Sequence, residues 1–139
     1  MQDCIFCKIV AGQIPSKVVR QESRAVAFLD AFPLAPGHTL VVPRAHYAKV
    51  QDMSGEDAAA VFALVHELTK AVESAAGVDA STIAVHNGSE AGQEVPHVHV
   101  HIIPRRRGDG AGPVHSMFKS RPKLSAEEMN AMLGKILRQ

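Results

Sequence analysis

The heptapeptide HVHVHII, residues 97–103, alternates histidine with an apolar residue along its whole length. Successive side chains of a β-strand point to opposite faces of a sheet, so the pattern places the three histidines on one face and the apolar residues on the other. Burial of the apolar face would hold the backbone rigid, and the histidines would then form a fixed row of groups that titrate near neutral pH. A single histidine is usually structural, but three in strict alternation indicate a chemically active strand.

Metal binding is the main alternative for such a row. At about 3.3 Å per residue, His97 and His101 lie roughly 13 Å apart along the strand, whereas zinc needs its nitrogen ligands about 2.0 to 2.1 Å away. One ion therefore cannot bind all three histidines. A zinc hydrolase that uses two of them together with a remote ligand stays open.

Other segments rich in Val, Ile and Phe are separated from this one by Pro and Gly residues. Strands are predicted for residues 17–21, 25–30, 38–42, 82–86 and 97–103. Short connections between neighbouring strands favour an antiparallel sheet with helices on one side, which is an α+β fold.

Two segments have the apolar periodicity of helices. The long one, Ser54 to Ala76, begins with a serine cap and an acidic first turn and ends at Gly77. The C-terminal one, Ser125 to Leu137, begins with a capping-box sequence. A short helical turn is expected at Cys4 to Val10.

The composition limits the functions that the chain can have. Its 139 residues suffice for one compact domain and nothing marks a second, so a single domain over residues 1–139 is expected. A formal net charge of +1 gives no general attraction to nucleic acid or to an anionic membrane. The sequence lacks a signal-peptide pattern and a long apolar run and has only two cysteines, which together predict a cytoplasmic protein.

The segment HVHVHIIPR resembles the motif of the histidine triad (HIT) family, in which three histidines alternate with apolar residues. The resemblance covers nearly the whole chain and includes residues 4–9 and 12–15, FLD at 28–30, PGH at 36–38, LVVP at 40–43, Gly88, and AGQ at 91–93 followed by Val95. It implies an α+β fold of the HIT type, a homodimer, and hydrolysis or transfer of purine nucleotides without a catalytic cofactor.

The resemblance also implies roles for the histidines. His99 attacks the α-phosphorus of a nucleotide and forms a nucleotidyl-histidine intermediate, which water then hydrolyses. Neutral imidazole is a good nucleophile, and two successive displacements have lower barriers than one difficult displacement. His101 contacts the phosphate and protonates the leaving group, and His38 is a fourth, supporting histidine. His97, the first residue of the row, belongs to the same catalytic set.

Phosphate contacts are expected from the loop before the triad and from the end of the preceding strand. The candidates are the backbone of Gly92 to Val95, which includes Glu94, the side chain of Gln93, and one of His86 or Asn87 at the strand end. Two of these positions depart from the family pattern, because members often carry Asn at the position of His86 and a hydroxyl residue at that of Glu94. The choice between His86 and Asn87 stays open at this point.

The nucleoside pocket is implied by the resemblance rather than by periodicity. Its base would contact Ile5, Phe6, Ile9 and Phe28, residues that composition alone would place in an ordinary core. Asp30 would accept hydrogen bonds from both ribose hydroxyls, since a carboxylate has the acceptor sites for a vicinal diol. Without the resemblance, Asp30 reads equally well as a turn residue at a strand end.

Cys4 and Cys7 have the two-residue gap of many zinc-binding pairs, although a redox pair has the same spacing. Resemblance to bacterial HIT proteins that carry this pair adds His46 and His97 as the other two ligands. The prediction is a structural zinc in a closed Cys₂His₂ set.

Three functions remain open besides the zinc hydrolase. The one favoured is a hydrolase of nucleoside phosphoramidates or related purine nucleotides, and a diadenosine polyphosphate hydrolase would use the same residues. The third is a slow nucleotide-binding or zinc-binding regulatory protein.

Overall fold

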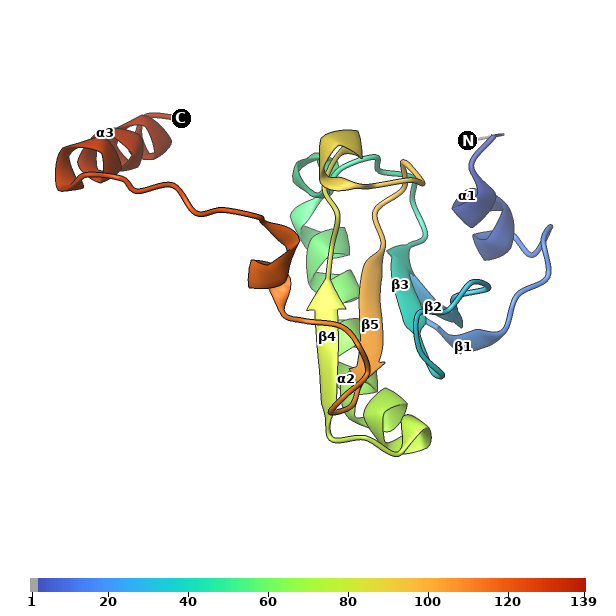
Figure 1. The fold of residues 1–139 in the computed structure, drawn as a ribbon. Coiled ribbons are helices and arrows are strands. Elements are labelled where there is room, and N and C mark those ends of the chain that lie inside the picture. Colours follow the sequence, from blue (N-terminus) through green and yellow to red (C-terminus); the bar gives the residue numbers. More distant parts are fainter. Residues whose placement is uncertain (1–2) are drawn as a thin grey trace. The chain divides into compact units, whose positions relative to one another are not determined.

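A computed structural model gives the fold and describes residues 3–139 of the chain. The helices are α1 (Ile5–Val10), α2 (Gly55–Ala76) and α3 (Ala126–Leu137), and the strands are β1 (Val18–Gln21), β2 (Ala25–Leu29), β3 (Thr39–Pro43), β4 (Ala80–Ala84) and β5 (Val100–Arg105) (Figure 1). Short 3₁₀ turns lie at Val50–Asp52, Ser89–Ala91 and Val114–Met117. The chain divides into two compact units, Met1–Asp109 and Gly110–Gln139.

The first unit is built on a five-stranded antiparallel sheet in the order β1-β2-β3-β5-β4. This confirms the predicted α+β class and the antiparallel pairing. The β3–β5 ladder joins strands that are distant in sequence and sets Leu40 opposite His101. It thereby brings the segment around His38 beside the triad strand. Strands β1 and β4 form the two edges of the sheet.

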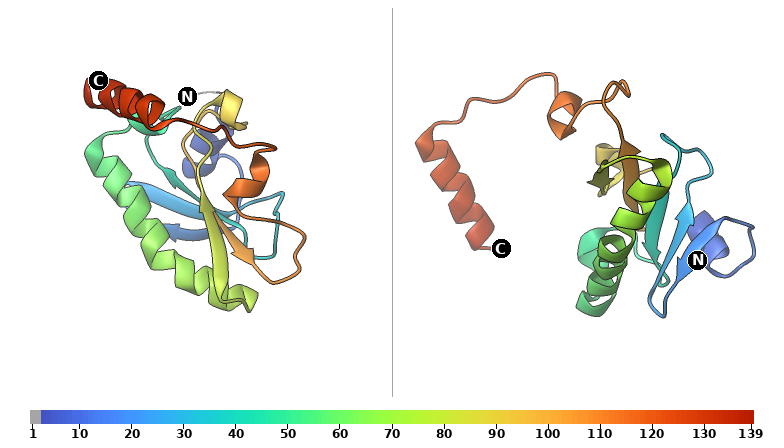
Figure 2. Two further views of the ribbon diagram at one scale, coloured as in Figure 1. Left: turned by 60° about the vertical axis from the view of Figure 1, so that its left-hand side comes forward. Right: turned by 90° about the horizontal axis from the view of Figure 1, so that it is seen from below.

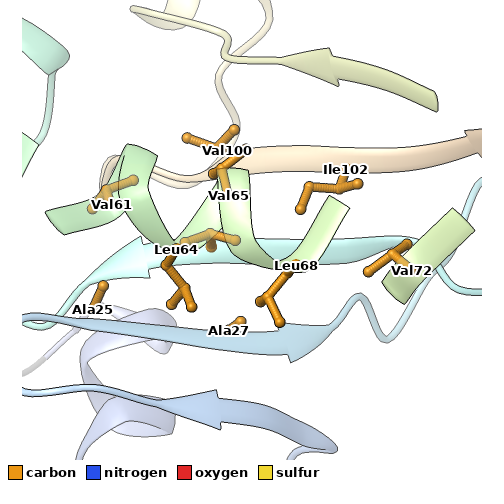
Figure 3. Close-up of a cluster of buried hydrophobic side chains, with 10 residues drawn as sticks. Ala25, Ala27, Val61, Leu64, Val65, Leu68, Val72, Val100 and Ile102 are labelled. Carbon is orange, nitrogen blue, oxygen red and sulfur yellow. The ribbon is translucent and has the colours of Figure 1, made fainter. Parts of the chain in front are cut away.

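Helix α2 covers one face of the sheet, as the views in Figure 2 show. It begins at the predicted serine, where the Ser54 side chain accepts from the N–H of Asp57, and ends at Gly77, whose φ of 71° suits glycine. Its apolar stripe packs on residues of β2, β3 and β5 (Figure 3). Helix and sheet together form one buried cluster, which consists of Ala25, Ala27, Val41, Val61, Leu64, Val65, Leu68, Val72, Val100 and Ile102.

The opposite face of the sheet is also covered, by the N-terminal segment. Cys4 and Phe6 pack there with the alternate residues of β2 and β3, namely Val26, Phe28, Leu40 and Val42. The prediction of helices on one side only is therefore wrong. The reason is visible in β2 and β3, which read AVAFL and TLVVP and are apolar at nearly every position, as strands buried on both faces are.

The triad strand differs from the prediction in its start. Strand β5 begins at Val100 rather than at residue 97, and the N–H of Val98 bonds the carbonyl of Tyr47 (2.8 Å) instead of a neighbouring strand. The alternation still holds, because Val98, Val100 and Ile102 are all buried, and Val100 and Ile102 pack in the cluster under α2. However, His97 is 0% exposed and His99 8%, so the histidine face is covered as well.

The second unit contains α3, and Ser125 and Glu128 form the predicted capping box at its start. No residue of this helix is buried, and its apolar side chains, Met129, Met132, Leu133, Ile136 and Leu137, are each more than half exposed. A single domain over residues 1–139 stays a prediction. Within residues 3–139, no helix combines the length and the apolar character needed to cross a membrane.

Candidate active site

A cluster of imidazole rings lies around His101, the first histidine of β5 proper. The ring centroids of His99, His38 and His86 lie 5.0, 5.2 and 5.4 Å from that of His101. His38 precedes β3 and His86 follows β4, so the two strands that pair with β5 each bring one histidine to its side. We call these four residues the histidine cluster.

The tautomer of His99 is determined by its own backbone. Its Nδ1 lies 2.8 Å from the carbonyl oxygen of His97, and a carbonyl can only accept, so Nδ1 carries the proton. Nε2 therefore keeps a free lone pair. Burial lowers the pKa of His99 below its usual value, which keeps the ring neutral at physiological pH. A neutral imidazole with one free, oriented nitrogen meets the chemical requirements of a nucleophile, the role that the resemblance implies for His99.

The rings of Phe6 and Phe28, which we call the aromatic wall, pack together, and Phe6 lies beside His99. The ring of Phe6 meets that of His99 edge-on at 5.0 Å and that of Phe28 at 5.5 Å. Phe28 is buried and Ile9 packs against the same apolar cluster, whereas Ile5 is 46% exposed. The structure thus gathers Phe6, Phe28 and Ile9 in one apolar cluster, of which Phe6 contacts His99, and leaves Ile5 half-exposed.

His38 connects the loop before β3 to His101. Its Nδ1 accepts from the backbone N–H of Leu34 (3.1 Å), and its Nε2 lies 2.9 Å from Nδ1 of His101. Burial lowers the pKa of His38, and it lowers the pKa of His101 to about 4. Both rings are therefore neutral at physiological pH. The Nε2 atom of His101 is buried and has no hydrogen-bond partner among the described residues.

Asp30 lies next to His38 at the end of β2. One carboxylate oxygen accepts from the N–H of Phe32 (2.9 Å), and the other lies 3.6 Å from Nε2 of His38. Since Oδ1 is held by the backbone and Asp30 is partly exposed, its carboxylate has acceptor sites left for a ligand. Its negative charge also offsets part of the burial effect on the pKa of His38.

The predicted phosphate-contact residues separate into two groups. Asn87 is exposed and turned to another loop, where it accepts from the N–H of Val50 (2.9 Å) and donates to Gln51 (3.0 Å). Gln93 accepts from the N–H of Gly88 and donates to the carbonyls of Ala48 and Val95, so its amide braces the loop. Both N–H groups of the Gln93 amide are used, so its side chain can donate to a phosphate only by breaking one of these bonds.

His86 and Glu94 remain available to a ligand. The ring of His86 is half-buried against His101, and no hydrogen bond within residues 3–139 engages it. Glu94 is exposed and lines a cavity of about 490 Å³ together with Ile5, His46 and Val95. Of the open pair His86 and Asn87, the structure places only His86 in the histidine cluster.

A second group, of two cysteines and two histidines, lies at the start of the triad segment. The ligand atoms of Cys4, Cys7, His46 and His97 all lie within 4.8 Å of one another. Nδ1 of His97 is 3.4 and 3.5 Å from the sulfurs of Cys4 and Cys7, and Nδ1 of His46 is 3.3 Å from that of Cys7. We call these residues the Cys₂His₂ group.

The donor chemistry of the Cys₂His₂ group fits a zinc ion. Zinc bonds of about 2.3 Å to sulfur and about 2.05 Å to nitrogen in a tetrahedron put the two ligands about 3.6 Å apart, close to the separations found here. Nε2 of His97 lies 2.9 Å from the carbonyl oxygen of Pro43 and so carries the proton. The lone pair of Nδ1 therefore points to the sulfurs, and such a backbone bond is typical of a metal-binding histidine.

Sequence reasoning could not name the backbone groups that orient these rings. The carbonyls of His97 and Pro43 and the N–H of Leu34 are main-chain atoms, which every residue type except proline offers in full. No side-chain pattern marks them, and only the folded chain decides which of them meets a ring nitrogen.

Comparison with known proteins gives concordant results. Residues 11–108 match the HIT domain family. A Schizosaccharomyces pombe protein named adenosine 5′-monophosphoramidase hnt1 is 38% identical over 134 residues, which are 94% of this chain and 98% of the relative. The crystal structure of a HIT family member from Bacillus subtilis is 36% identical, with a TM-score of 0.88 and coverage of 99% and 96% of the two chains. A structure described as a zinc-bound histidine triad family protein from Mycobacterium smegmatis is 29% identical, with a TM-score of 0.74 and coverage of 99% and 97%.

Proposed function

Because the chain belongs to the HIT family, we propose that it is a nucleotide hydrolase that cleaves purine nucleoside phosphoramidates through a nucleotidyl intermediate on His99. The observation that carries this proposal is the 2.8 Å contact between Nδ1 of His99 and the carbonyl of His97. That contact leaves Nε2 unprotonated and fixed in direction. The name of the S. pombe relative, a monophosphoramidase, supports the choice of a phosphorus–nitrogen bond as the target.

The reaction divides into two displacements at phosphorus. In the first, the lone pair on Nε2 of His99 forms a bond to the α-phosphorus, and the phosphorus–nitrogen bond breaks as the leaving amine takes up a proton from a solvent water molecule. In the second, another water attacks the same phosphorus, gives up a proton to the solvent, and the bond to His99 breaks, which releases the nucleoside monophosphate and restores the neutral ring. Donors in the histidine cluster, His101 and His86, would meet the charge on the phosphate oxygens.

Replacing the nucleophile tests the proposal directly. The His99→Ala protein should lose turnover of adenosine phosphoramidate by roughly a thousandfold or more, because no other group can form the intermediate. An acid quench of the native protein during turnover should also trap an adenylylated chain, detected by mass spectrometry. The matched control is His115→Ala, an exposed histidine of the second unit. Near-native turnover by His99→Ala would refute the mechanism.

We further propose that Asp30 recognises the ribose of the substrate. Its carboxylate lies at the end of β2, the strand that carries the buried Phe28, and keeps acceptor sites beyond its bond to Phe32. A base packed on the aromatic wall would bring its ribose near this strand end.

This role predicts a preference for ribonucleotides. A 2′,3′-dideoxy analogue should bind more weakly than the ribonucleotide by about 1.5 to 3 kcal/mol, the value of hydrogen bonds to a charged group. The Asp30→Ala protein should lose that preference, measured by calorimetric titration of both ligands. Equal affinities in the native protein would exclude Asp30 from ribose recognition.

For the Cys₂His₂ group, we propose a structural zinc ion. Both cysteines are free thiols in this structure, and the protonated Nε2 of His97 leaves Nδ1 as a ready ligand. Four protein ligands complete a tetrahedron, so the ion would stabilise the fold rather than activate water. It would hold α1 against the segment that precedes β5.

Removal of a ligand should separate the structural role from the chemical one. The Cys4→Ser protein should contain much less zinc than the roughly one ion per chain expected for native protein, and its melting temperature should fall. The His66→Ala protein, changed at an exposed histidine of α2, should keep its zinc. Metal content is measured by atomic emission on protein purified without added zinc. A metal-free native protein whose stability a chelator does not change would remove this site.

The last part of the proposed function is a homodimer through the edge strand β4. This strand has backbone groups without a neighbouring strand, and two-fold pairing with a second copy would extend the sheet. Beside it, a cavity of about 730 Å³ is lined by half-exposed Phe62 of α2 and Ile83 of β4. This cavity lies away from the histidine cluster, and its polar lining includes both Lys70 and Glu73, which can pair across a two-fold axis.

A charge placed on this edge should break the dimer. The Ile83→Lys protein should elute as a monomer, whereas Val19→Lys, on the opposite edge strand β1, should remain a dimer like the native protein. Light scattering coupled to size-exclusion chromatography gives the mass of each. A native monomer, or a dimer that survives Ile83→Lys, would contradict the proposed interface.

A further inference from the structure

The hydrogen bonds that meet at His38 run in one direction. The first donor is the backbone N–H of Leu34, which bonds Nδ1 of His38 at 3.1 Å. An amide nitrogen cannot accept, so Nδ1 of His38 is an unprotonated acceptor. A neutral imidazole carries one proton, and in His38 it must therefore be on Nε2.

The same reasoning extends to His101. Nε2 of His38 lies 2.9 Å from Nδ1 of His101, and because Nε2 carries the proton, it is the donor. Nδ1 of His101 is then the acceptor, and the proton of that ring is on Nε2. Burial of both rings, which lowers both pKa values, keeps each of them in this neutral state.

We propose that the backbone N–H of Leu34, acting through His38, holds His101 as the tautomer protonated on Nε2, so that this N–H is a permanent hydrogen-bond donor for a phosphate oxygen of the substrate. Leu34 and His38 are positioning residues in this scheme, and His101 is the residue that touches the ligand. The identity of the ligand rests on the proposed function, whereas the tautomer does not.

The environment of Nε2 of His101 supports a ligand as its missing partner. This atom is buried and has no acceptor among residues 3–139, although its ring touches those of His99 and His86. Buried polar groups in proteins almost always have a partner, so an unpaired donor beside a nucleophile indicates an acceptor that arrives with the substrate. A phosphoryl group attached to His99 would bring several such oxygens.

We call the chain of hydrogen bonds from Leu34 through His38 to His101 the relay. Its direction also argues against metal binding by the same residues. Asp30, His38 and His101 offer ligand atoms within 4.8 Å of one another and could hold a cation by distance alone. A cation would need the lone pair of Nε2 on His38, which would put a proton on Nδ1. That proton would face the N–H of Leu34, donor against donor. The Leu34 amide therefore favours the relay over a metal ion at this place.

The relay can be read in the native protein and reversed by a single-atom change. Long-range ¹H–¹⁵N spectra of free native protein should show Nδ1 of both His38 and His101 without a proton. An amide-to-ester exchange at Leu34, made by incorporating the corresponding α-hydroxy acid, replaces the donor N–H by an acceptor oxygen and keeps the side chain. Each ring should then carry its proton on Nδ1, which leaves Nε2 of His101 with a lone pair that repels phosphate.

The matched control is the same exchange at Ala35, whose N–H makes no hydrogen bond within the described residues. The Ala35 ester should keep the native tautomers. Relative to it, the Leu34 ester should lose roughly a hundred- to a thousandfold in kcat/KM for adenosine phosphoramidate, as for other lost donors to a developing oxyanion.

A protonated Nδ1 on His101 of the native protein would overturn the proposal whether or not the ester variants fold. A Leu34 ester whose His38 and His101 keep the native tautomers would overturn it as well. Because the spectra are recorded without substrate, they remain decisive if turnover of nucleotides is not found. Reversed tautomers with equal kcat/KM in the two esters would refute the contact between His101 and phosphate while leaving the relay in place.

Discussion

Backbone groups of neighbouring segments determine which nitrogen of each buried imidazole carries the proton, and the chemistry of the site depends on this constraint. The carbonyl of His97 accepts from the protonated Nδ1 of His99, and the carbonyl of Pro43 accepts from the protonated Nε2 of His97. A histidine ring without such a bond could turn or exchange its tautomer, and its free lone pair would then have no fixed direction. The result is that adjacent histidines of one segment present opposite nitrogens to different tasks, Nε2 in His99 and Nδ1 in His97.

Burial of the histidine rings also supports this arrangement, because it lowers their pKa values. It is the largest cause of the lowered pKa values of His97, His99 and His101, with His97 and His101 near 4. In addition, each protonated ring would repel its neighbours in the cluster. The rings therefore stay neutral at physiological pH, as both a nitrogen nucleophile and a metal ligand must be. Part of the cover comes from Phe6 in the N-terminal segment, whose ring lies against those of His97 and His99.

Tyr47 connects the site to the core on the other side. Its carbonyl accepts from the N–H of Val98, and its hydroxyl donates to Asp57 in the first turn of α2 (2.6 Å). Arg24 bonds the same carboxylate at 2.8 Å, and these two bonds are the main cause of the lowered pKa of Asp57. Asp57 is 6% exposed, so the loss of either partner would leave a buried charge poorly paired. The position of the triad segment thus depends on how α2 is anchored.

The sequence by itself determined the elements and most of the candidate site. Alternation in HVHVHII identified the strand face, the cap at Ser54 and Gly77 bounded α2, and the CxxC spacing identified half of the Cys₂His₂ group. These features are local, since side-chain periodicity and capping act over a few residues. Only the tertiary structure decided the second cover on the sheet, the separation of His86 from Asn87, and the tautomers. Those depend on which backbone atom from a distant segment meets a given side chain, and main-chain atoms leave no trace in residue identity.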